Sequence, residues 1–254
     1  MLIETLSVFP EMFEPVMSTS ILGRARQAGI FDFAAYNLRD WTHDRHRTVD
    51  DEPYGGGQGM LMMAPPIFEA VRAIASHGPR PHIVFFTPCG TPFDQHAAER
   101  LSREERILFV CGRYEGIDER AYALADERLS IGDYVLTGGE LAAMVVTDAV
   151  VRLLPGALGD AMSSVDESFA TSDGGGLLEY AQYTRPADFE GMGVPEILRS
   201  GDHAKVDAWR RENAIERTCR WRPDLIPRAG LTQSERARAE ELVTRYHGSS
   251  PSQA

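Results

Sequence analysis

Three apolar runs in the first half of the chain each lead into a short polar loop that contains glycine. The runs at 83–86 and 107–110 precede loops at 87–90 and 111–120, and a third loop of this kind covers 130–140. Glycine reaches positive φ angles and lets a ligand touch the main chain. Loops that follow neighbouring strands of a parallel sheet meet at one edge of that sheet. The pattern therefore predicts one small-molecule pocket at the ends of adjacent strands.

Strand and helix patterns alternate from the N-terminus to about residue 154. Alternation of this kind predicts an α/β fold with a mostly parallel sheet and helices packed on it. The expected strands are 2–8, 31–38, 82–86, 106–110 and 128–131, and the expected helices are 10–17, 20–28, 66–76, 94–102, a short one from Ile117, and 140–154.

The character of the sequence changes after Pro155. Small, polar and glycine-rich residues follow, which are typical of a flexible linker. Helical patterns return at 202–219 and 233–246, the second with Thr232 as a candidate N-cap. The expected divisions are an α/β domain at 1–158, a linker at 159–176, a small helical domain at 177–248 and a disordered tail at 249–254.

Composition argues against a membrane protein and favours a reducing compartment. No apolar run approaches the ~18–20 residues of a membrane span. The residues after Met1 lack the basic leader of a signal peptide, so we expect the first strand to begin there. The cysteines, Cys89, Cys111 and Cys219, are odd in number and lack metal-site spacing, which favours a cytoplasmic setting.

The net charge of −12 hides an uneven distribution along the chain. From Arg199 onward there are 11 basic and 8 acidic residues, against 15 basic and 30 acidic residues before it. All but one of the basic residues are arginine, whose planar fork suits phosphates and guanine edges. A GC-rich genome would produce the same bias, so RNA binding and base composition both remain open as explanations.

Two further features resemble binding motifs only in part. The glycine run at 55–59 lacks the Gly-Lys-Ser/Thr of a P-loop, and no G-x-G-x-x-G follows a strand, so a structural turn is the default interpretation. His43 and His46 have a spacing found in metal sites, but no third Cys or His is near. A charged loop, either solvated or in contact with an anionic substrate, explains them better.

Several charged residues allow both a structural and a catalytic interpretation. Arg152 ends an apolar helix, so it is either a cation at a helix C-terminus or an arginine that faces a pocket. Asp166 and Glu167 lie in the expected linker, where most acids are solvated. A carboxylate on a mobile segment could instead act as a general base once substrate orders that segment. Glu115 and Asp118 could serve ligand, metal or structure.

Five sequence runs match one family in the same order along the chain. They are residues 54–60, 111–120, 130–140, 155–159 and 183–186. Together they resemble the bacterial tRNA (guanine-N1)-methyltransferases of the SPOUT class, which methylate guanine at position 37 of the anticodon loop. One glycine loop would be weak support, whereas five ordered runs are specific, and the resemblance extends over about residues 1–247.

The resemblance implies a homodimer that binds the tRNA anticodon stem-loop, with an active site shared between subunits. It also implies a deep trefoil knot that holds S-adenosylmethionine, a feature that general topology rules disfavour and periodicity does not predict. The family's cofactor contacts fall on Pro88, Gly90, Gly112, Ile131, Gly132, Asp133, Tyr134, Val135, Leu136, Gly138 and Gly139.

The resemblance also assigns catalytic roles. The family's catalytic arginine falls on Arg152, which would stabilise negative charge on guanine O6. Its general base is an aspartate directly before a Ser-Phe pair, a position that holds Glu167 here. Register favours Glu167 as the base, and Asp166, one residue earlier, is the alternative. A Mg²⁺ ion is also expected for the family, with Glu115 as the matching carboxylate.

Three other hypotheses remain at this point. The chain could be a SPOUT methyltransferase that acts on ribose or on rRNA. It could be a non-catalytic RNA-binding module, although the intact cofactor-binding runs argue against this. It could also bind a nucleotide through residues 55–59, a hypothesis that the missing Lys-Ser/Thr weakens.

Overall fold

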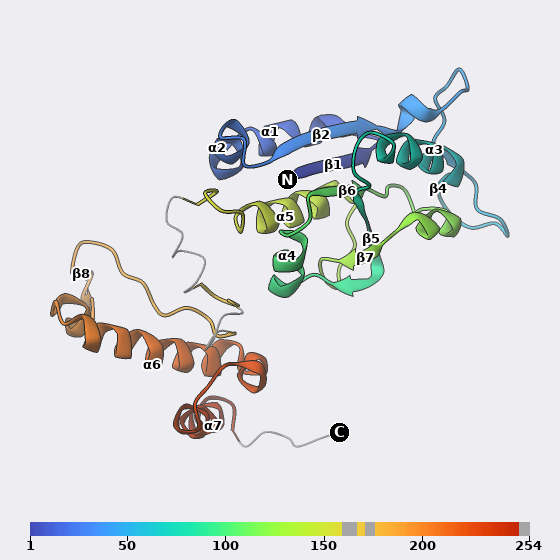
Figure 1. The fold of residues 1–254 in the computed structure, drawn as a ribbon. Coiled ribbons are helices and arrows are strands. Elements are labelled where there is room, and N and C mark those ends of the chain that lie inside the picture. The colour runs from blue at the N-terminus through green and yellow to red at the C-terminus, as the bar shows by residue number, and fades with distance from the viewer. Residues whose placement is uncertain (159–166, 171–175, 249–254) are drawn as a thin grey trace. The chain divides into compact units, whose positions relative to one another are not determined.

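The computed structural model describes residues 1–158, 167–170 and 176–248 (Figure 1). The chain divides into two compact units, Met1–Ala161 and Met162–Ala254. The first unit is α/β and the second is mainly helical. No helix in the described part of the chain is long and apolar enough to span a membrane.

A five-stranded sheet forms the centre of the first unit, and all of its strand pairs are parallel. The strand order is β2–β1–β6–β5–β7, so the predicted parallel α/β sheet is confirmed. Every residue of β6, in the middle, is buried, because neighbours on both edges and helices on both faces cover it. The bounds are β1 Leu2–Ser7, β2 Asp32–Asn37, β5 His82–Pro92, β6 Arg106–Val110 and β7 Glu127–Ser130.

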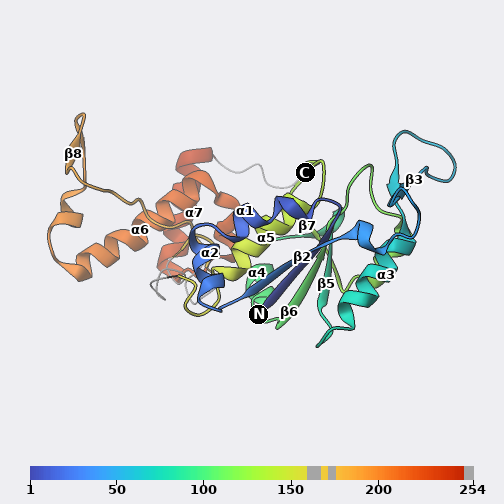
Figure 2. The same ribbon diagram turned by 90° about the horizontal axis from the view of Figure 1, so that it is seen from above.

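Helices cover both faces of this sheet (Figure 2). One face holds α1 (Glu14–Met17), α2 (Ser20–Gln27), α4 (Gln95–Leu101) and α5 (Glu140–Val151). The other holds α3 (Ala64–Ala75), with 3₁₀ helices η2 (Leu38–Trp41) and η3 (Glu119–Leu124).

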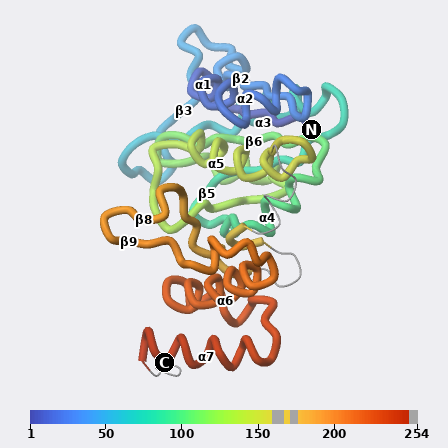
Figure 3. Tube along the Cα trace, turned by 90° about the vertical axis from the view of Figure 1, so that its left-hand side faces the viewer, coloured from blue at the N-terminus to red at the C-terminus, as the bar shows by residue number. Residues whose placement is uncertain are grey.

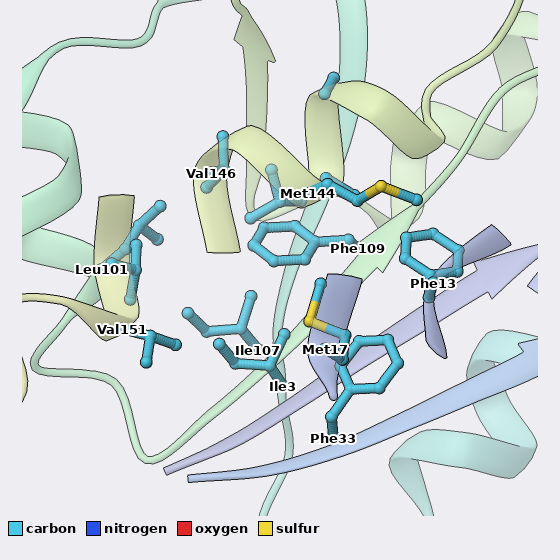
Figure 4. Packing of buried hydrophobic residues seen from close by; sticks show 14 of the residues in the cluster. Ile3, Phe13, Met17, Phe33, Leu101, Ile107, Phe109, Met144, Val146 and Val151 are labelled. Atoms are coloured by element: carbon cyan, nitrogen blue, oxygen red, sulfur yellow. The ribbon is translucent and has the colours of Figure 1, made fainter. Parts of the chain in front are cut away.

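The core under α5 shows how the strands hold this helix in place. Phe109 of β6 lies against Met144 and Val146 of α5, and all three are buried (Figure 4). Burial of a side chain of this size contributes about 1.5–3 kcal/mol relative to exposure. Apolar contacts on this face therefore fix the position of α5 on the sheet, and with it the loop that precedes α5.

Two predicted helices have a different form in the structure. Residues 10–17 are a 3₁₀ turn, η1 (Pro10–Met12), followed by α1. Pro15 lacks the amide hydrogen that a continuous helix would need at that position, which accounts for the break. The helix expected from Ile117 is η3, which begins after Asp118 because the Asp118 carboxylate accepts a hydrogen bond from the Arg120 amide at 3.0 Å.

The predicted loop at 87–90 lies within a strand in the structure. β5 continues through residues 87–90 to Pro92, and its register against β7 shifts between Phe86 and Thr91, which both pair with Leu129. Pro88 cannot donate a ladder hydrogen bond, as is common at such irregularities. β3 (Asp50–Asp51) and β4 (Leu61–Met62) pair antiparallel. They lie between the predicted strand at 31–38 and the predicted helix at 66–76, where no strand was expected.

The amino ends of the strands contain a buried ion pair. Arg106 Nε of β6 lies 2.6 Å from Glu4 Oε2 of β1, and both residues are at most 5% exposed. Arg106 also donates to the carbonyls of Ile74, His77 and Pro79, at and after the end of α3. The pair thus joins β1 and β6 to α3, and loss of one partner from such a pair typically costs about 3–5 kcal/mol.

The second unit consists of two helices and a hairpin (Figure 3). α6 (His203–Trp221) and α7 (Gln233–His247) pack through Ile215, Cys219 and Leu242. The remaining elements are β8 (Asp188–Phe189), β9 (Met192–Gly193), η5 (Glu196–Arg199) and η6 (Pro223–Arg228).

A capping box begins α7, and Thr232 is its N-cap as predicted. The Glu235 carboxylate accepts a hydrogen bond from the Thr232 amide at 2.7 Å and lies 2.7 Å from Nε of Arg211 on α6. The hydrogen bond from Arg211 is the main cause that lowers the pKa of Glu235 from 4.5 to about 2. Glu235 therefore stabilises the packing of α6 and α7 in its ionised form.

We expect Glu235→Gln to destabilise the protein at neutral pH by about 1.5–3 kcal/mol, the range for a hydrogen bond to a charged group. Because folding lowers the pKa, the ionised state contributes its full stability above about pH 4.5 and loses it as the pH falls towards 2. Thermal unfolding followed by circular dichroism at several pH values measures the difference. Glu241→Gln, whose carboxylate is 70% exposed, is the control. A pH-independent difference between Glu235→Gln and the parent protein would contradict the prediction.

Candidate functional site

The three glycine loops meet at one pocket beyond the carboxyl ends of β5, β6 and β7, with a volume of about 180 Å³. Its walls are residues of β5 at 86–88, the loop after β6 at 112–117, and the segment from β7 to the start of α5 at 129–139. Ala142 of α5 and Tyr122 of η3 complete the lining. The pocket predicted from the loop pattern is therefore present.

Nine of the eleven expected cofactor residues line this pocket, while Gly90 and Asp133 lie outside its lining. Glu115, the expected metal ligand, is a lining residue as well. Most of the other lining residues belong to the predicted loops, whereas Tyr122 does not, because η3 reaches the pocket only through the tertiary fold. The further lining residues are Phe86, Thr87, Arg113, Tyr114, Gly116, Ile117, Leu129, Ser130, Thr137 and Ala142.

Gly90 is required by contact between strands. A Cβ atom at this position would lie 2.5 Å from the carbonyl carbon of Leu129 on β7, a distance that real Cβ atoms do not reach. β5 therefore passes directly against the backbone of β7 beside the pocket. The glycine serves the packing of one wall, although the sequence pattern had associated it with a ligand.

Gly138 and Gly139 bring two loops into direct contact. The Gly139 amide donates a hydrogen bond to the Gly112 carbonyl at 2.8 Å, and a Cβ at Gly139 would lie 2.9 Å from the Cα of Cys111. A Cβ at Gly138 would lie 2.3 Å from Nε of Arg113. The absence of these side chains lets the segment before α5 pack on the loop after β6.

The loop after β7 folds back on itself through Tyr134. The Tyr134 hydroxyl donates to the Ile131 carbonyl at 3.1 Å, and its ring covers Gly132, which has a φ of 145°. A side chain at Gly132 would collide with this ring. Val135, at the tip, is 90% exposed. This loop presents backbone groups to the pocket and an apolar tip to solvent.

The segment around β4 supports the loop after β6 from the other side. The Glu115 amide donates to the Met60 carbonyl at 3.0 Å, and the Met62 amide donates to the Gly116 carbonyl at 2.9 Å. The Glu115 side chain lies where a Cβ of Gly59 would be, and Gly59 has a φ of 78°. The end of the glycine run at 55–59 is therefore a structural support for the pocket wall.

The described residues do not form a ligand cluster for either of the metal sites considered from the sequence. Within residues 1–158, 167–170 and 176–248, no group of three His, Cys, Asp or Glu side chains is placed to hold an ion. His43 lies 2.9 Å from Glu69 of α3, at the surface. Asp118 is paired with Arg120 at 2.6 Å, and this hydrogen bond is the main cause that lowers the pKa of the Asp118 carboxyl.

The thiol of Cys111, the residue before the lining residue Gly112, is structural. Cys111 is fully buried, and burial raises its pKa well above the ordinary value, so the thiol stays protonated and a poor nucleophile. Its amide donates to the Leu6 carbonyl at 2.9 Å, which continues the β1–β6 pairing into the loop.

The expected catalytic residues lie in different units. Arg152 is the C-cap of α5 and is half-buried, with its amide bonded to the Asp148 carbonyl at 3.2 Å. Glu167 is half-buried and belongs to the second unit, and Asp166 lies outside the described residues. The residues after Glu167 are anchored, since the Ser168 hydroxyl accepts a hydrogen bond from the Glu179 amide at 3.0 Å.

A parallel α/β sheet with a pocket at the carboxyl ends of three adjacent strands defines a protein that binds a small molecule at that edge. A family model described as tRNA (Guanine-1)-methyltransferase TrmD matches residues 1–228. The chain belongs to this family, so the resemblance inferred from its motifs is confirmed.

Curated relatives extend over nearly the whole chain. A protein of Symbiobacterium thermophilum named tRNA (guanine-N(1)-)-methyltransferase is 52% identical over 96% of this chain and 99% of its own length. Proteins with the same name from Dictyoglomus turgidum and Lactiplantibacillus plantarum are 49% and 50% identical, each over 94% of this chain and 96% and 95% of their own lengths.

We expect Gly90→Ala to lower the free energy of unfolding by about 1–3 kcal/mol, the usual cost of overpacking, because the added methyl group collides with the backbone of β7. Urea unfolding measures this change. The control is Gly193→Ala, where a Cβ meets no atom within 4 Å, and there we expect a change within about 0.5 kcal/mol. Equal stability of the two variants would show that β5 and β7 can separate at low cost.

Proposed function

We propose that the protein transfers the methyl group of S-adenosylmethionine to N1 of guanine at position 37 in the anticodon loop of tRNA. Membership of the TrmD family supports the guanine-N1 specificity, because the family description and the relatives' names both state it. The observation on this chain that carries the proposal is the pocket beyond β5, β6 and β7. Its walls are the loops on which the family's cofactor contacts fall.

The pocket suits the nucleoside part of this cofactor. Apolar side chains such as Ile117 and Leu129 can pack against adenine, and the backbone of residues 131–136 can hydrogen-bond its edge and the ribose. When bound, S-adenosylmethionine supplies a methyl group already activated by a sulfonium, so alignment accounts for much of the remaining barrier. Gly90 and Asp133 are proposed to act on the cofactor only through the backbone that they shape.

Arg152 and Glu167 are the proposed catalytic residues, with Asp166 as the alternative base. Guanine N1 carries a proton and is a poor nucleophile while neutral, so a carboxylate that accepts the proton assists methyl transfer. Negative charge then grows towards O6, where the Arg152 guanidinium would stabilise it. The contacts of Glu115 are those of a wall residue, so we assign no step to Mg²⁺.

Exposed apolar side chains support a homodimer with a shared active site. Leu141 and Val145 lie one turn apart on α5, next to the pocket, and each is 50% exposed. A contiguous exposed apolar face near a site commonly marks a protein–protein interface. We extend the proposal to the family's deep trefoil knot in the first unit and to a linker over 159–176 that brings the base to the site.

The second unit is the proposed binding site for the anticodon stem-loop. Several of its arginines lie over aromatic rings, including Arg210 over Tyr180 at 4.8 Å and Arg220 over Trp221 at 4.6 Å. Trp221 is 61% exposed. Arginine and exposed aromatic side chains recognise RNA phosphates and unstacked bases. An enzyme that acts on tRNA in this way would work in the cytoplasm.

The nucleoside product tests the proposed function directly. We expect an anticodon stem-loop with guanine at position 37, incubated with the protein and S-adenosylmethionine, to yield 1-methylguanosine by mass spectrometry of the digested RNA. Adenine at position 37 should give no product, because its C6 amino group is a hydrogen-bond donor at the position where the Arg152 guanidinium would stabilise charge on guanine O6. A 2′-O-methyl product would overturn the proposal in favour of a ribose methyltransferase, and a lack of cofactor binding would favour a non-catalytic RNA-binding module.

Arg152→Ala should lower the single-turnover rate of methyl transfer by about 10²–10³-fold, the usual cost of removing a group that stabilises transition-state charge. Cofactor affinity, measured by calorimetry, should stay the same because Arg152 lies outside the pocket lining. Arg24→Ala, on the exposed face of α2, is the control. A near-normal rate in the Arg152 variant would remove this residue from the mechanism.

The identity of the base follows from a pair of isosteric variants. Glu167→Gln should lower the single-turnover rate by about 10²-fold or more, since the amide cannot accept the N1 proton, whereas Asp166→Asn should retain activity. Glu167→Asp, which restores the family's residue, should also retain activity. The opposite pattern for Glu167→Gln and Asp166→Asn would assign the base to Asp166.

A further inference from the structure

A buried carboxylate beneath the pocket joins three segments that are distant in the sequence. Glu140, the first residue of α5, is fully buried. Its Oε1 accepts a hydrogen bond of 2.6 Å from the Ser7 hydroxyl at the end of β1. Its Oε2 lies 2.9 Å from Nε of Arg113, in the loop after β6. We call these three residues, Ser7, Arg113 and Glu140, the carboxylate cluster.

Groups that attract negative charge surround this buried carboxylate. Glu140 lies in the first turn of α5, where the helix dipole favours negative charge, and Arg113 supplies the neutralising positive charge. The Arg113 N–H is not aligned for a hydrogen bond to Glu140, so their contact is mainly electrostatic. An ion pair of this kind is costly to break, because removal of one partner leaves an uncompensated charge.

Arg113 carries the effect of this carboxylate to the pocket wall. Its Nη1 donates to the Thr137 carbonyl at 3.3 Å, its Nη2 lies 3.1 Å from Sδ of Met12, and its guanidinium stacks on the Phe9 ring at 4.7 Å. Together with Glu140, these groups contact the Arg113 guanidinium on several sides. Arg113, itself a lining residue, thus also holds the backbone of the wall through Thr137.

The pocket wall has a glycine, Gly138, where it lies against the carboxylate cluster. A Cβ at Gly138 would lie 2.3 Å from Nε of Arg113 and 2.5 Å from Oε2 of Glu140. Gly138 also pairs with Arg113 in an antiparallel bridge. The backbone at 137–139 therefore lies directly on the ion pair, and its course depends on where the pair lies.

We propose that Glu140 is a positioning residue for cofactor binding, which acts through Arg113 to hold the backbone of residues 137–139 in the shape that the pocket requires, with Ser7 orienting its carboxylate. The inference rests on the proposed function for the identity of the ligand, S-adenosylmethionine. Without the negative charge, Arg113, whose side chain is 17% exposed, would lose the carboxylate that balances its charge. It would move towards solvent and release the Thr137 carbonyl.

The chain provides a matched control in a second buried ion pair. Glu4 is 1% exposed and forms an ion pair with Arg106, as Glu140 does with Arg113, but this pair lies at the amino ends of the strands, away from the pocket. Glu4→Gln therefore tests the general cost of losing a buried carboxylate. Glu140→Gln tests the same chemical change beneath the pocket.

The experiment measures three properties of each full-length variant. Calorimetry gives the Kd for S-adenosylmethionine, hydrogen exchange reports the amides of residues 136–139, and urea unfolding gives stability. We expect Glu140→Gln to raise Kd by about tenfold or more, equivalent to ~1.4 kcal/mol, and to accelerate exchange at these amides. Glu4→Gln should lower stability while its Kd and the exchange at 136–139 stay close to those of the parent protein.

Two further variants keep the test decisive if Glu140→Gln folds poorly. Ser7→Ala removes the hydrogen bond to Glu140 and the one that the Ser7 hydroxyl accepts from the Phe9 amide, and it should raise Kd by a smaller factor, about threefold. In an Arg113→Gln background, Glu140→Gln should add no further loss of affinity, because the two residues act through one path. If both carboxylate variants lose stability but bind the cofactor like the parent protein, Glu140 is merely structural and the proposal fails. A parent protein that does not bind S-adenosylmethionine would overturn the proposed function instead, and exchange at 136–139 would still report on the cluster.

Discussion

The close contact between the loop after β6 and the segment before α5 is the constraint on which the site depends. A hydrogen bond of 2.8 Å from Gly139 to Gly112 joins the two backbones, and neither Gly138 nor Gly139 has room for a side chain. This contact closes one side of the pocket and starts α5 directly beneath it. The apolar packing of α5 on β6 then holds the contact in place, because Met144 and Val146 are buried against Phe109.

Charged groups inside the first unit lie at both ends of the sheet and have different consequences. At the amino ends, Glu4 and Arg106 tie β1 and β6 to the end of α3. At the carboxyl ends, Glu140 and Arg113 lie under the loops that form the pocket. Both pairs need partners from distant parts of the chain, so they favour one arrangement of the strands over alternatives. Only the second pair contacts backbone that a ligand would touch.

The proposed chemistry divides between the two units. The first unit contains the pocket and Arg152, and the second contains Glu167 and the arginine–aromatic pairs that suit RNA. The proposed reaction requires groups from both units, so its proposed trigger is the binding of tRNA. Glutamate in place of the aspartate that the resemblance implies would add one methylene to the reach of the proposed base.

The sequence by itself determined the α/β class, the five strands of the central sheet, most helices and the loops that form the pocket. These features follow from local patterns, namely apolar periodicity and glycine after strands, which the chain carries whatever its tertiary structure. Family motifs added the ligand and the catalytic residues as predictions. Only the tertiary structure determined which glycines are required for packing. Gly90 and Gly139 lie against the backbone of other segments, and no local sequence pattern encodes these contacts.

The partners of the buried charges were also decided only by the tertiary structure. Ser7 and Glu140 are 133 positions apart, and Glu4 and Arg106 are 102 apart, so only the tertiary fold brings each pair together. Likewise, the bulge that carries β5 through residues 87–90 exists because β7 offers a second set of hydrogen bonds there. Long-range pairing sets these contacts, and a single sequence shows the residues but not their neighbours.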